Sequence, residues 1–442
     1  MSKANYVPLS LFLKEREDRY SPEQANELKL RRIEKIDFSG KIHLADGKTT
    51  RTGMILVRKG DLIVSGINVE KGAIAVYRGE EDVLATIHYS SYSFDEHIVD
   101  VKYFEWFLRS TPFRGIINSS TRGGIKTELK SKGFLSLLVP LPNLDMQVAA
   151  RTKLDSVANE IREIIDLGQE NEEYVQKLRQ QILQEAISGN LVPQDPNDEP
   201  ASELLAKIKT EKERQIREGK VKKEIPLPSI TREEIPFSLP KGWDWAKLGN
   251  ITLRVQDGTH SSPKNQYKEP SPNRYLYITS KNIKETGVDT STASYIDAEV
   301  HRALSKRCKP ELSDILMIKD GAITGRVTLN DIKEEFTMLS SVALIRTDRT
   351  NIENRFLLYY LRSPTGFEQV TGRMTGSAIT RIILKRIKNT IVPLPPLSEQ
   401  RRIVRKVDQL MELCDELEER ITKGEKNSEF LMEAVLKEVF AL

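Results

Sequence analysis

The chain has 442 residues, of which 30% are charged and 38% hydrophobic, and its formal net charge at pH 7 is +4. This length predicts two or three domains, and so small a net charge is weak support for a nucleic-acid partner unless basic residues gather locally. The two cysteines, Cys308 and Cys414, lack metal-ligand spacing and exclude a disulfide framework, which fits a reducing cytoplasm. No apolar run approaches the ~18 residues of a membrane span, and the charged segment Lys14–Asp18 is unlike a signal peptide.

Residues 1 to about 140 are predicted to form a mixed α/β domain. Segments rich in β-branched residues and bounded by glycines predict short strands at Met54–Val57, Asp61–Val64 and Ala73–Tyr77. A short helix is predicted at Tyr103–Leu108 and a further strand at Phe134–Val139. Ser119–Thr127, between these two, is a small, polar loop that carries several of the domain's cations.

From Gln147 onward the spacing of apolar residues becomes helical. They recur at alternating three- and four-residue steps, as in the a/d seam of a coiled coil, at Leu154, Val157, Ile161, Ile164, Val175, Leu178 and Ile182. Gly168 and Asn171 interrupt this seam, and a glycine lowers helix propensity. A helix from Leu154 to Ala186 would be roughly 50 Å long at ~1.5 Å per residue, provided that the interruption does not end it.

Residues 188–241 predict a solvated connector. Ser188–Pro200 is rich in turn-forming residues, and prolines punctuate the end of the segment. Ser202 is placed to cap a charged helix that would end near Gly219.

A second α/β domain is predicted to begin near Gly242. Its polar turn, Asp257–Lys264, is followed by predicted strands at Arg274–Thr279, Ser313–Ile318 and Arg326–Leu329. Arg373–Arg381 is its cationic loop, in a position that matches the loop of the first domain.

The second domain is a diverged copy of the first. Val139-Pro-Leu-Pro-Asn-Leu-Asp-Met-Gln147 shares its skeleton with Val392-Pro-Leu-Pro-Pro-Leu-Ser-Glu-Gln400, an offset of 392 − 139 = 253. The same offset pairs Leu108-Arg-Ser110 with Leu361-Arg-Ser363, and no gap is needed. A constant offset over so long a span indicates an internal duplication.

The offset also produces a second helical seam, at Val407, Leu410, Cys414, Leu417, Ile421, Leu431 and Val435. Gly424 and Ser428 interrupt this second seam near the position that matches the interruption of the first, since Gly424 is the counterpart of Asn171. Similar interruptions predict that the two helices pack on each other, antiparallel if a two-fold axis relates the halves. The alternative is that each seam packs only on its own domain.

Motifs for catalysis are missing from the sequence. There is no Gly-x-x-x-x-Gly-Lys-Ser/Thr phosphate loop and no His-Glu-x-x-His pair, and the five histidines form no cluster. Asp100-Val-Lys102 ends like a nuclease motif but lacks a convincing partner aspartate, so a surface pair explains it better. The sequence therefore predicts no catalytic, cofactor or metal site in this chain.

Polar and cationic loop residues are the better candidates for function, as contacts to DNA. Lys and Arg neutralise phosphates, while Arg, Asn and Ser/Thr also read base edges. The candidates are Asn68, Lys71, Arg122, Lys126, Lys130, His260, Ser261, Lys264, Lys281, Asn282, Arg373, Thr375, Ser377, Thr380 and Arg381. The alternative for each is an ordinary solvated loop or, around Asp257-Gly258, a hairpin turn.

With these repeats and helices, the whole chain resembles the specificity subunit of type I restriction–modification systems. The resemblance is carried by Val392–Arg401 opening the last helix, Ile182–Pro193, Leu239–Trp243 and Asp257–Lys264. The first copy departs from the family pattern, because Asn143 replaces a proline, Asp145-Met146 replaces Ser-Glu, and the Gly-Trp opening is missing.

The resemblance implies an α+β fold with pseudo-two-fold symmetry, in which two long antiparallel helices separate two tandem target-recognition domains. Each domain would read one half of a split double-stranded DNA site. The helices would dock two modification (methyltransferase) subunits, which bind S-adenosylmethionine and methylate adenine. A restriction subunit would add ATP- and Mg-dependent translocation and cleavage, and this chain itself would hold no cofactor.

The expected boundaries are target-recognition domains at residues 1–145 and 241–397, helical spacers at 146–190 and 398–442, and a linker with a short helix at 191–240. A spacer of ~50 Å against ~34 Å per DNA turn would place the half-sites about one turn apart. The alternatives are a stand-alone nuclease or methyltransferase, a coiled-coil adaptor that binds protein, and the specificity component of a methylation system without a restriction subunit.

Overall fold

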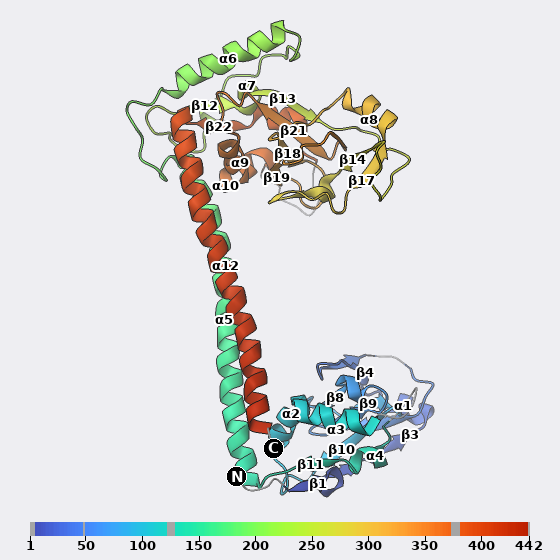
Figure 1. Ribbon diagram of the computed structural model, residues 1–442. Helices are drawn as coiled ribbons and strands as arrows, with labels where there is room; N and C mark the ends of the chain where they lie inside the picture. Colours follow the sequence, from blue (N-terminus) through green and yellow to red (C-terminus); the bar gives the residue numbers. More distant parts are fainter. Residues whose placement is uncertain (1–4, 47–48, 122–128, 373–380, 441–442) are drawn as a thin grey trace. The chain divides into compact units, whose positions relative to one another are not determined.

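The computed structural model describes residues 5–46, 49–121, 129–372 and 381–440 (Figure 1). It divides into two compact units: residues up to 171 together with those from 420 onward, and residues 172–419. Each unit holds one α/β domain and parts of the same two long helices. None of the helices in the described ranges is long and apolar enough to cross a membrane.

The first unit is built on three sheets, in the orders β1-β11, β2-β10-β7-β8 and β3-β6-β9-β4-β5. Their strands are β1 Tyr6–Pro8, β2 Leu13–Glu15, β3 Arg19–Tyr20, β4 Arg32–Ile36, β5 Ile42–Ala45, β6 Met54–Val57, β7 Leu62–Ser65, β8 Ile74–Val76, β9 Val83–Thr86, β10 Tyr89–Phe94 and β11 Leu138–Pro140. Its short helices are α1 Pro22–Glu27, α2 Val101–Arg109, α3 Thr111–Thr121 and α4 Ser131–Leu135.

The second unit has four sheets, in the orders β12-β22, β13-β21-β18-β19, β17-β14-β20 and β15-β16. Their strands are β12 Asp244–Lys247, β13 Thr252–Asp257, β14 Arg274–Ile278, β15 Ile283–Lys284, β16 Gly287–Val288, β17 Ser294–Asp297, β18 Ile315–Ile318, β19 Val327–Leu329, β20 Phe336–Met338, β21 Val342–Thr347 and β22 Ile391–Leu394. Its shorter helices are α6 Ala201–Arg217, α7 Leu248–Ile251, α8 Ala298–Ser305, α9 Asn354–Arg362, α10 Pro364–Thr371 and α11 Leu384–Asn389.

The duplication inferred from the sequence is a duplication of structure. Adding 253 to the bounds of β7, β8, β10 and α2 gives the bounds of β18, β19, β21 and α9. The first copy lacks the Gly-Trp sequence, but β1 takes the place of β12 there. Tyr6 of β1 pairs with Pro140, as Trp245 of β12 pairs with Pro393. Pro140 and Pro393 differ by 253 but Tyr6 and Trp245 by 239, so this part of the repeat lies beyond the reach of a constant offset.

Three local predictions were wrong. Phe134–Val139 is not one strand: α4 comes first, because Phe134 and Leu137 are both buried at a helical spacing, and only the following residues join β11. The cationic loop does not begin at Ser119, which lies in the last turn of α3. Ser202 does not cap α6; the N-cap is Pro200, and Ser202 lies inside the helix.

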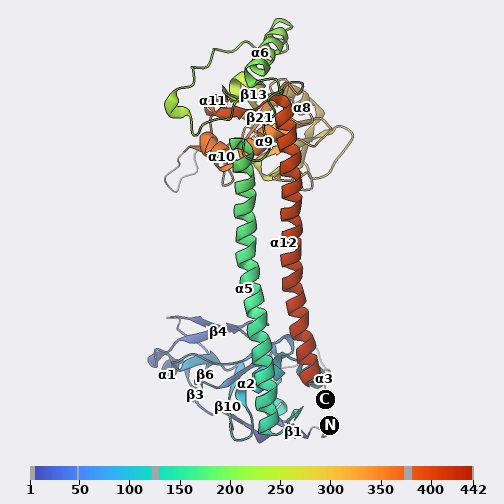
Figure 2. The same ribbon diagram turned by 90° about the vertical axis from the view of Figure 1, so that its left-hand side faces the viewer.

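The two long helices are α5 Leu144–Ser188 and α12 Leu397–Phe440, and the predicted interruptions break neither of them. In the first unit Lys153 Nζ lies 2.8 Å from Glu438 Oε1, and a Cβ added at Gly168 would lie 3.0 Å from Glu425 Oε1. The contacts of α5 run toward lower residue numbers in α12 as they run toward higher ones in α5, so the helices are antiparallel. In the second unit Arg179 shows the same direction, with Nη2 2.5 Å from Asp415 and 3.1 Å from Glu418. Within each unit the ribbons of α5 and α12 lie side by side (Figures 1 and 2).

The seam residues divide into two sets. Leu154, Ile161, Val175, Ile182, Val407, Cys414 and Val435 are buried, and Val157, Leu410 and Ile421 are half-buried. Four others were wrongly assigned to the seam, because Ile164, Leu178, Leu417 and Leu431 remain 44%, 44%, 42% and 49% exposed. Leu154 and Val435 also join the core of the first domain, so the helices pack both on each other and on the domains.

A buried glutamine fixes the start of each long helix to its domain. Gln147 donates from Nε2 to the carbonyl oxygens of Ile98 and Pro142 at 3.1 and 2.8 Å, and its Oε1 accepts from the Asp100 N–H at 2.8 Å. The last proline of the repeated Pro-Leu-Pro segment, Pro142, thus accepts a hydrogen bond from the side-chain amide of Gln147 in the first turn of α5. Without these bonds, buried main-chain polar groups would be unsatisfied.

Gln400 repeats the arrangement in the second unit. Its Nε2 donates to the Pro395 carbonyl oxygen at 2.9 Å, and its Oε1 accepts from the Glu353 N–H at 3.0 Å. The partners Pro395 and Glu353 are the counterparts of Pro142 and Asp100 at the offset of 253. Two of the three bonds of Gln147 are therefore repeated at Gln400.

A second repeated contact lies further along each helix. In the first unit the Trp106 indole N–H donates to Asp155 at 2.9 Å, from α2 to α5. In the second unit the Tyr359 hydroxyl donates to Asp408, from α9 to α12. Both residues of each pair obey the offset, so an aromatic donor and a helical aspartate fix the rotation of each helix against its domain.

Replacing Gln400 with leucine, which has nearly the same shape but no amide, should lower the free energy of unfolding by about 1–3 kcal/mol. The loss is expected because the Glu353 N–H and the Pro395 carbonyl would be left buried without partners. Urea unfolding followed by circular dichroism measures the effect. Gln409→Leu, at an exposed position of the same helix, is the matched control, and equal stability of both variants would contradict the role of Gln400.

Candidate nucleic-acid interface

Six of the candidate DNA contacts, namely Arg122, Lys126, Arg373, Thr375, Ser377 and Thr380, lie outside the described residues. The remaining nine are distributed over both domains. In each domain, one main-chain hydrogen bond shows which of them come together.

In the first domain that bond joins the Leu129 N–H to the Gly66 carbonyl oxygen at 2.9 Å. It brings the exposed Lys130 close in space to the turn that carries Asn68 and Lys71. Asn68 is half-buried, and the Lys71 ammonium is exposed, 5.8 Å from the centre of the Phe38 ring. Lys130 and the pair Asn68 and Lys71, which lie far apart in the sequence, therefore belong to one polar surface.

In the second domain the equivalent bond joins the Ile382 N–H to the Lys319 carbonyl oxygen at 2.9 Å. It places Arg381 next to Asp320, with Arg381 Nε 3.3 Å from the carboxylate. The Arg381 side chain is 55% exposed, so its guanidinium is both oriented and accessible.

Asp257, at the end of β13, is the centre of an ion-pair network in the second domain. Its carboxylate lies 3.1 Å from Lys319 Nζ and 2.7 Å from Arg307 Nη2. The side chains of Asp257 and Lys319 are 6% and 2% exposed, whereas that of Arg307 is 50% exposed. Two buried charges thus support one exposed guanidinium.

Arg307 was missed in the sequence, because it follows α8 and lies far from the polar turn in the chain. Its Nε donates to the Gly258 carbonyl oxygen at 3.2 Å, and its Nη2 donates to His260 Nε2 at 2.8 Å. Nη1 has no hydrogen-bond partner in the described part of the chain. A guanidinium held in this way offers its free edge to a phosphate or a base acceptor with little further loss of freedom.

The network also controls the charge of Asp257. Burial alone would raise the pKa of its carboxyl group, but hydrogen bonds from Arg307 and Lys319 outweigh burial and lower that pKa. Asp257 is therefore ionised at neutral pH, and Arg307 keeps its partner.

The other candidates of the second domain have different surroundings. His260, Ser261, Lys264 and Lys281 are exposed. Asn282 was a wrong choice, because it is buried and its amide is already used within the domain: Oδ1 accepts from the Thr279 N–H at 2.9 Å, and Nδ2 donates to the Asp289 carbonyl oxygen at 3.1 Å.

Among the described residues of the first domain the Asp257 network has no equivalent, and Gly66 and Ile67 stand at the positions of Lys319 and Asp320. What the domains share is a buried aspartate before β7 and β18. Asp61 binds Arg16 at 2.9 Å, and Asp314 binds Arg346 at 2.6 Å. Shared ion pairs therefore support the scaffold, while the interfaces differ.

The structure offers no candidate for catalysis or metal binding in the residues that it describes. No group of three or more His, Cys, Asp or Glu side chains there is placed to hold a metal ion. Both cysteines are buried, and burial raises the pKa of the Cys308 thiol to about 12, which keeps it protonated at neutral pH. Fold and site together define a protein of two related modules on paired helices, with oriented surface cations.

Comparison with known proteins found relatives of the second module and of the fold. Residues 240–424 match the family described as the type I restriction modification DNA specificity domain. The chain is 34% identical over 273 residues to the type I restriction enzyme EcoAI specificity subunit of Escherichia coli. It is 32% identical over 270 residues to the EcoEI specificity subunit of the same species. Each match covers 59% of this chain, which spans only 44% and 43% of the lengths of these relatives.

Solved structures show the same fold. A chain from a type I R-M system matches with a TM-score of 0.65 at 19% identity, over 100% of this chain and 98% of that one. The HsdS subunit from Thermoanaerobacter tengcongensis matches with a TM-score of 0.54 at 18% identity, over 99% and 97%. The predicted resemblance to type I specificity subunits is confirmed, as is the α+β fold of two tandem domains with long helices. The names of the relatives agree with a non-catalytic role.

Replacing Asp257 with asparagine should destabilise the second domain at neutral pH, by up to roughly 3–5 kcal/mol, because the buried Lys319 loses its ionised partner. The folded pKa of Asp257 lies below its ordinary value, so its stabilisation is present above the unfolded pKa of about 3.9 and is lost as the pH falls through the folded pKa. The difference between wild type and variant should therefore shrink on acidification. Urea unfolding from pH 7 to 3 measures it, with exposed Asp244→Asn as control; a difference independent of pH would exclude the ion pair as its cause.

Proposed function

We propose that this chain is the DNA-specificity subunit of a type I restriction–modification complex. Residues 1–145 and 241–397 act as two target-recognition domains that read the two halves of a bipartite, asymmetric double-stranded DNA site. The helical segments 146–190 and 398–442 act as the spacer, and 191–240 as the linker. The chain has no catalytic role, and the complex acts in the cytoplasm.

The observation that carries this proposal is the contrast between a repeated scaffold and divergent additions. The strands and helices around β7 and β18 follow one offset. Beside them, the first domain carries the five-stranded sheet β3-β6-β9-β4-β5, and the second carries the three-stranded sheet β17-β14-β20. A common scaffold with different surfaces suits the reading of two different sequences from equivalent positions.

Two modification subunits are the proposed partners on the helices. Ile164 and Leu431 are exposed on the helix pair of the first unit, and Leu178 and Leu417 on that of the second. Ile164 and Leu417 are related by the offset of 253, as are Leu178 and Leu431. Exposed apolar side chains repeated in this way suit two copies of one partner.

Catalytic chemistry is assigned to the partners. The modification subunits would bind S-adenosylmethionine and methylate an adenine flipped out of the duplex, and restriction subunits would supply ATP- and Mg-dependent translocation and cleavage. A methylation system without a separate restriction subunit would use this chain in the same way. The apolar helix positions also suit a coiled-coil adaptor that binds protein only, but the oriented cations Arg307 and Arg381 favour DNA.

Methylation mapping tests the proposal. The chain is expressed with its methyltransferase partner in cells whose genome is then sequenced for methylated bases. A split, asymmetric motif with methylated adenines that disappears when this gene is deleted is the expected result, and it defines both half-sites and their gap. Unchanged methylation with an active partner would favour the adaptor.

Arg307→Ala and Arg381→Ala should each weaken recognition of one half-site only, by roughly ten- to a hundredfold if a good base contact is lost. Duplexes with one half-site intact and the other scrambled separate the two contributions in a binding assay with the assembled complex. Arg232→Ala, at an exposed position in the linker, should bind like wild type. Equal losses on both half-sites would contradict split recognition.

A double substitution, Ile164→Glu with Leu431→Glu, should weaken binding of one modification subunit at least about tenfold, because charges would enter an apolar contact. Native mass spectrometry of the assembled complex should show a shift from two bound partners to one. Exposed Gln169→Glu, on the same helix, adds a charge without removing an apolar group and should retain two. Two partners on the double variant would place the docking surface elsewhere.

A further inference from the structure

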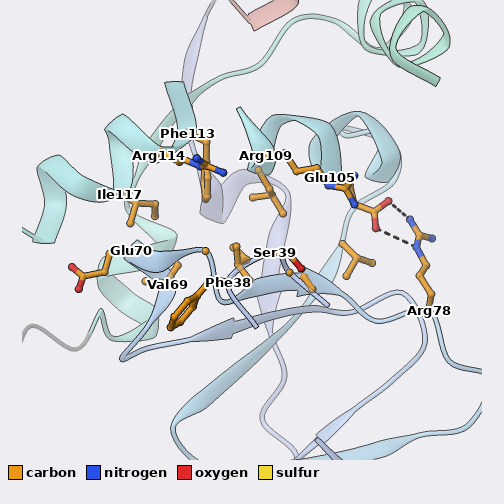
Figure 3. A pocket seen from close by; sticks show the side chains of 16 residues that line it. Phe38, Ser39, Val69, Glu70, Arg78, Glu105, Arg109, Phe113, Arg114 and Ile117 are labelled. Atoms are coloured by element: carbon orange, nitrogen blue, oxygen red, sulfur yellow. Dashed lines mark hydrogen bonds and ion pairs between the residues drawn. The ribbon is translucent and has the colours of Figure 1, made fainter. Parts of the chain in front are cut away.

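The first domain contains a cavity of about 270 Å³ that plays no part in the proposed contacts to DNA. It lies between Phe38 and Val69 on one side and Phe113 and Ile117 on the other (Figure 3). Val69, Phe113 and Ile117 are buried core residues, so the inner wall is apolar. The cavity is also lined by three arginines and two glutamates, namely Arg78, Arg109, Arg114, Glu70 and Glu105.

The second domain shows what occupies the equivalent place when the chain fills it by itself. Phe367 packs so closely over Gly325 that a Cβ added there would lie 2.5 Å from its ring. Arg362 closes the edge, donating to the Val327 carbonyl oxygen at 3.1 Å and also to the Glu285 carbonyl oxygen. Phe367, which remains 46% exposed, thus covers the glycine from the solvent side, and main-chain oxygens hold the Arg362 guanidinium.

Both elements are altered in the first domain. At the offset of 253, Arg114 replaces Phe367, and Gly72 matches Gly325. The Phe38 main chain lies over Gly72, where an added Cβ would be 2.5 Å from the Phe38 carbonyl oxygen. Arg109 matches Arg362, but its guanidinium lies 5.2 Å from the centre of the Trp106 ring instead of closing the cavity.

The charges at the edge are also unbalanced. Arg78 Nη2 is paired with Glu105 at 2.5 Å (Figure 3). Arg109 and Arg114, by contrast, have no carboxylate partner among the described residues. Three arginines against two glutamates leave one net positive charge, which suits a monoanion.

We propose that this cavity binds a small organic acid with an aromatic or branched aliphatic body. The body lies against Val69, Phe113 and Ile117, where apolar burial is favourable. The carboxylate lies between Arg109 and Arg114, because a guanidinium forms charge-assisted, paired hydrogen bonds with it. The cavity volume is just below the range of small-molecule sites, which limits the ligand to about the size of one aromatic side chain.

Titration of the full-length chain with 3-phenylpropionate, followed by ligand-observed NMR and calorimetry, tests this site. Wild type should bind one equivalent saturably, and the uncharged 3-phenylpropanol should bind at least about tenfold more weakly, or 1.4 kcal/mol. Arg114→Phe imitates the second domain, filling the cavity and removing a cation, and should abolish binding. Arg51→Phe, at an exposed arginine outside the cavity, should bind like wild type.

Arg109→Gln, with Arg51→Gln as its control, tests the second cation without filling the cavity. It should weaken binding of the acid but not of the alcohol. Circular dichroism establishes that each variant is folded. Failure of the folded wild type to bind the acid saturably, or equal binding of the acid by Arg114→Phe, would overturn the proposal. Binding to DNA is measured separately, so either result leaves the specificity role untouched.

Discussion

The fixed attachment of each long helix to its domain is the constraint on which the rest of the structure depends. Gln147 and Gln400 hold the helix starts through buried hydrogen bonds. Further along the same helices, Asp155 and Asp408 fix the rotation of each helix about its axis relative to its domain. The far end of the other helix completes each domain: Phe440 contacts the rings of Tyr103 and Phe107 in the first core, and Ile187, its counterpart at 253, lies in the second. Each domain is thus closed by both helices, so domain stability and helix pairing are coupled.

On this attachment the two domains have diverged in what they add to the scaffold. A buried aspartate that binds an arginine, Asp61 or Asp314, is present in both domains. Within the described residues, the Asp257 network belongs to the second domain, and the cavity lined by Phe113 and Ile117 belongs to the first. The same offset therefore separates the shared scaffold from the parts in which the domains differ. Phe367 and Arg114 occupy equivalent positions but differ in size and charge. Such positions mark where the surfaces of the two domains differ.

Much of this architecture could be predicted from sequence, because the repeat and the helical period are local patterns that survive divergence. The predicted strands at Ser313–Ile318 and Arg326–Leu329, which repeat a strand pair of the first copy, contain β18 and β19. Phe134 was misassigned because a single helical turn and a strand present equally apolar residues. Arg307 and Asn282 could not be judged, since their roles depend on partners such as Asp257 and Asp289 that only the fold brings near. The exposed Ile164 and Leu178 follow an ideal seam in sequence, but three-dimensional packing leaves them uncovered.

The glutamine attachment has a consequence for how such a protein can evolve. Gln147 and Gln400 bond only to main-chain atoms of Ile98, Asp100, Pro142, Glu353 and Pro395. The joint is therefore indifferent to which side chains those positions carry, provided that the backbone keeps its course. Substitutions or recombination can therefore replace the surface of a domain while the joint between domain and helix persists. The domains can change in sequence because the hydrogen bonds of the joint end on main-chain atoms, which every residue type provides except for the N–H of proline.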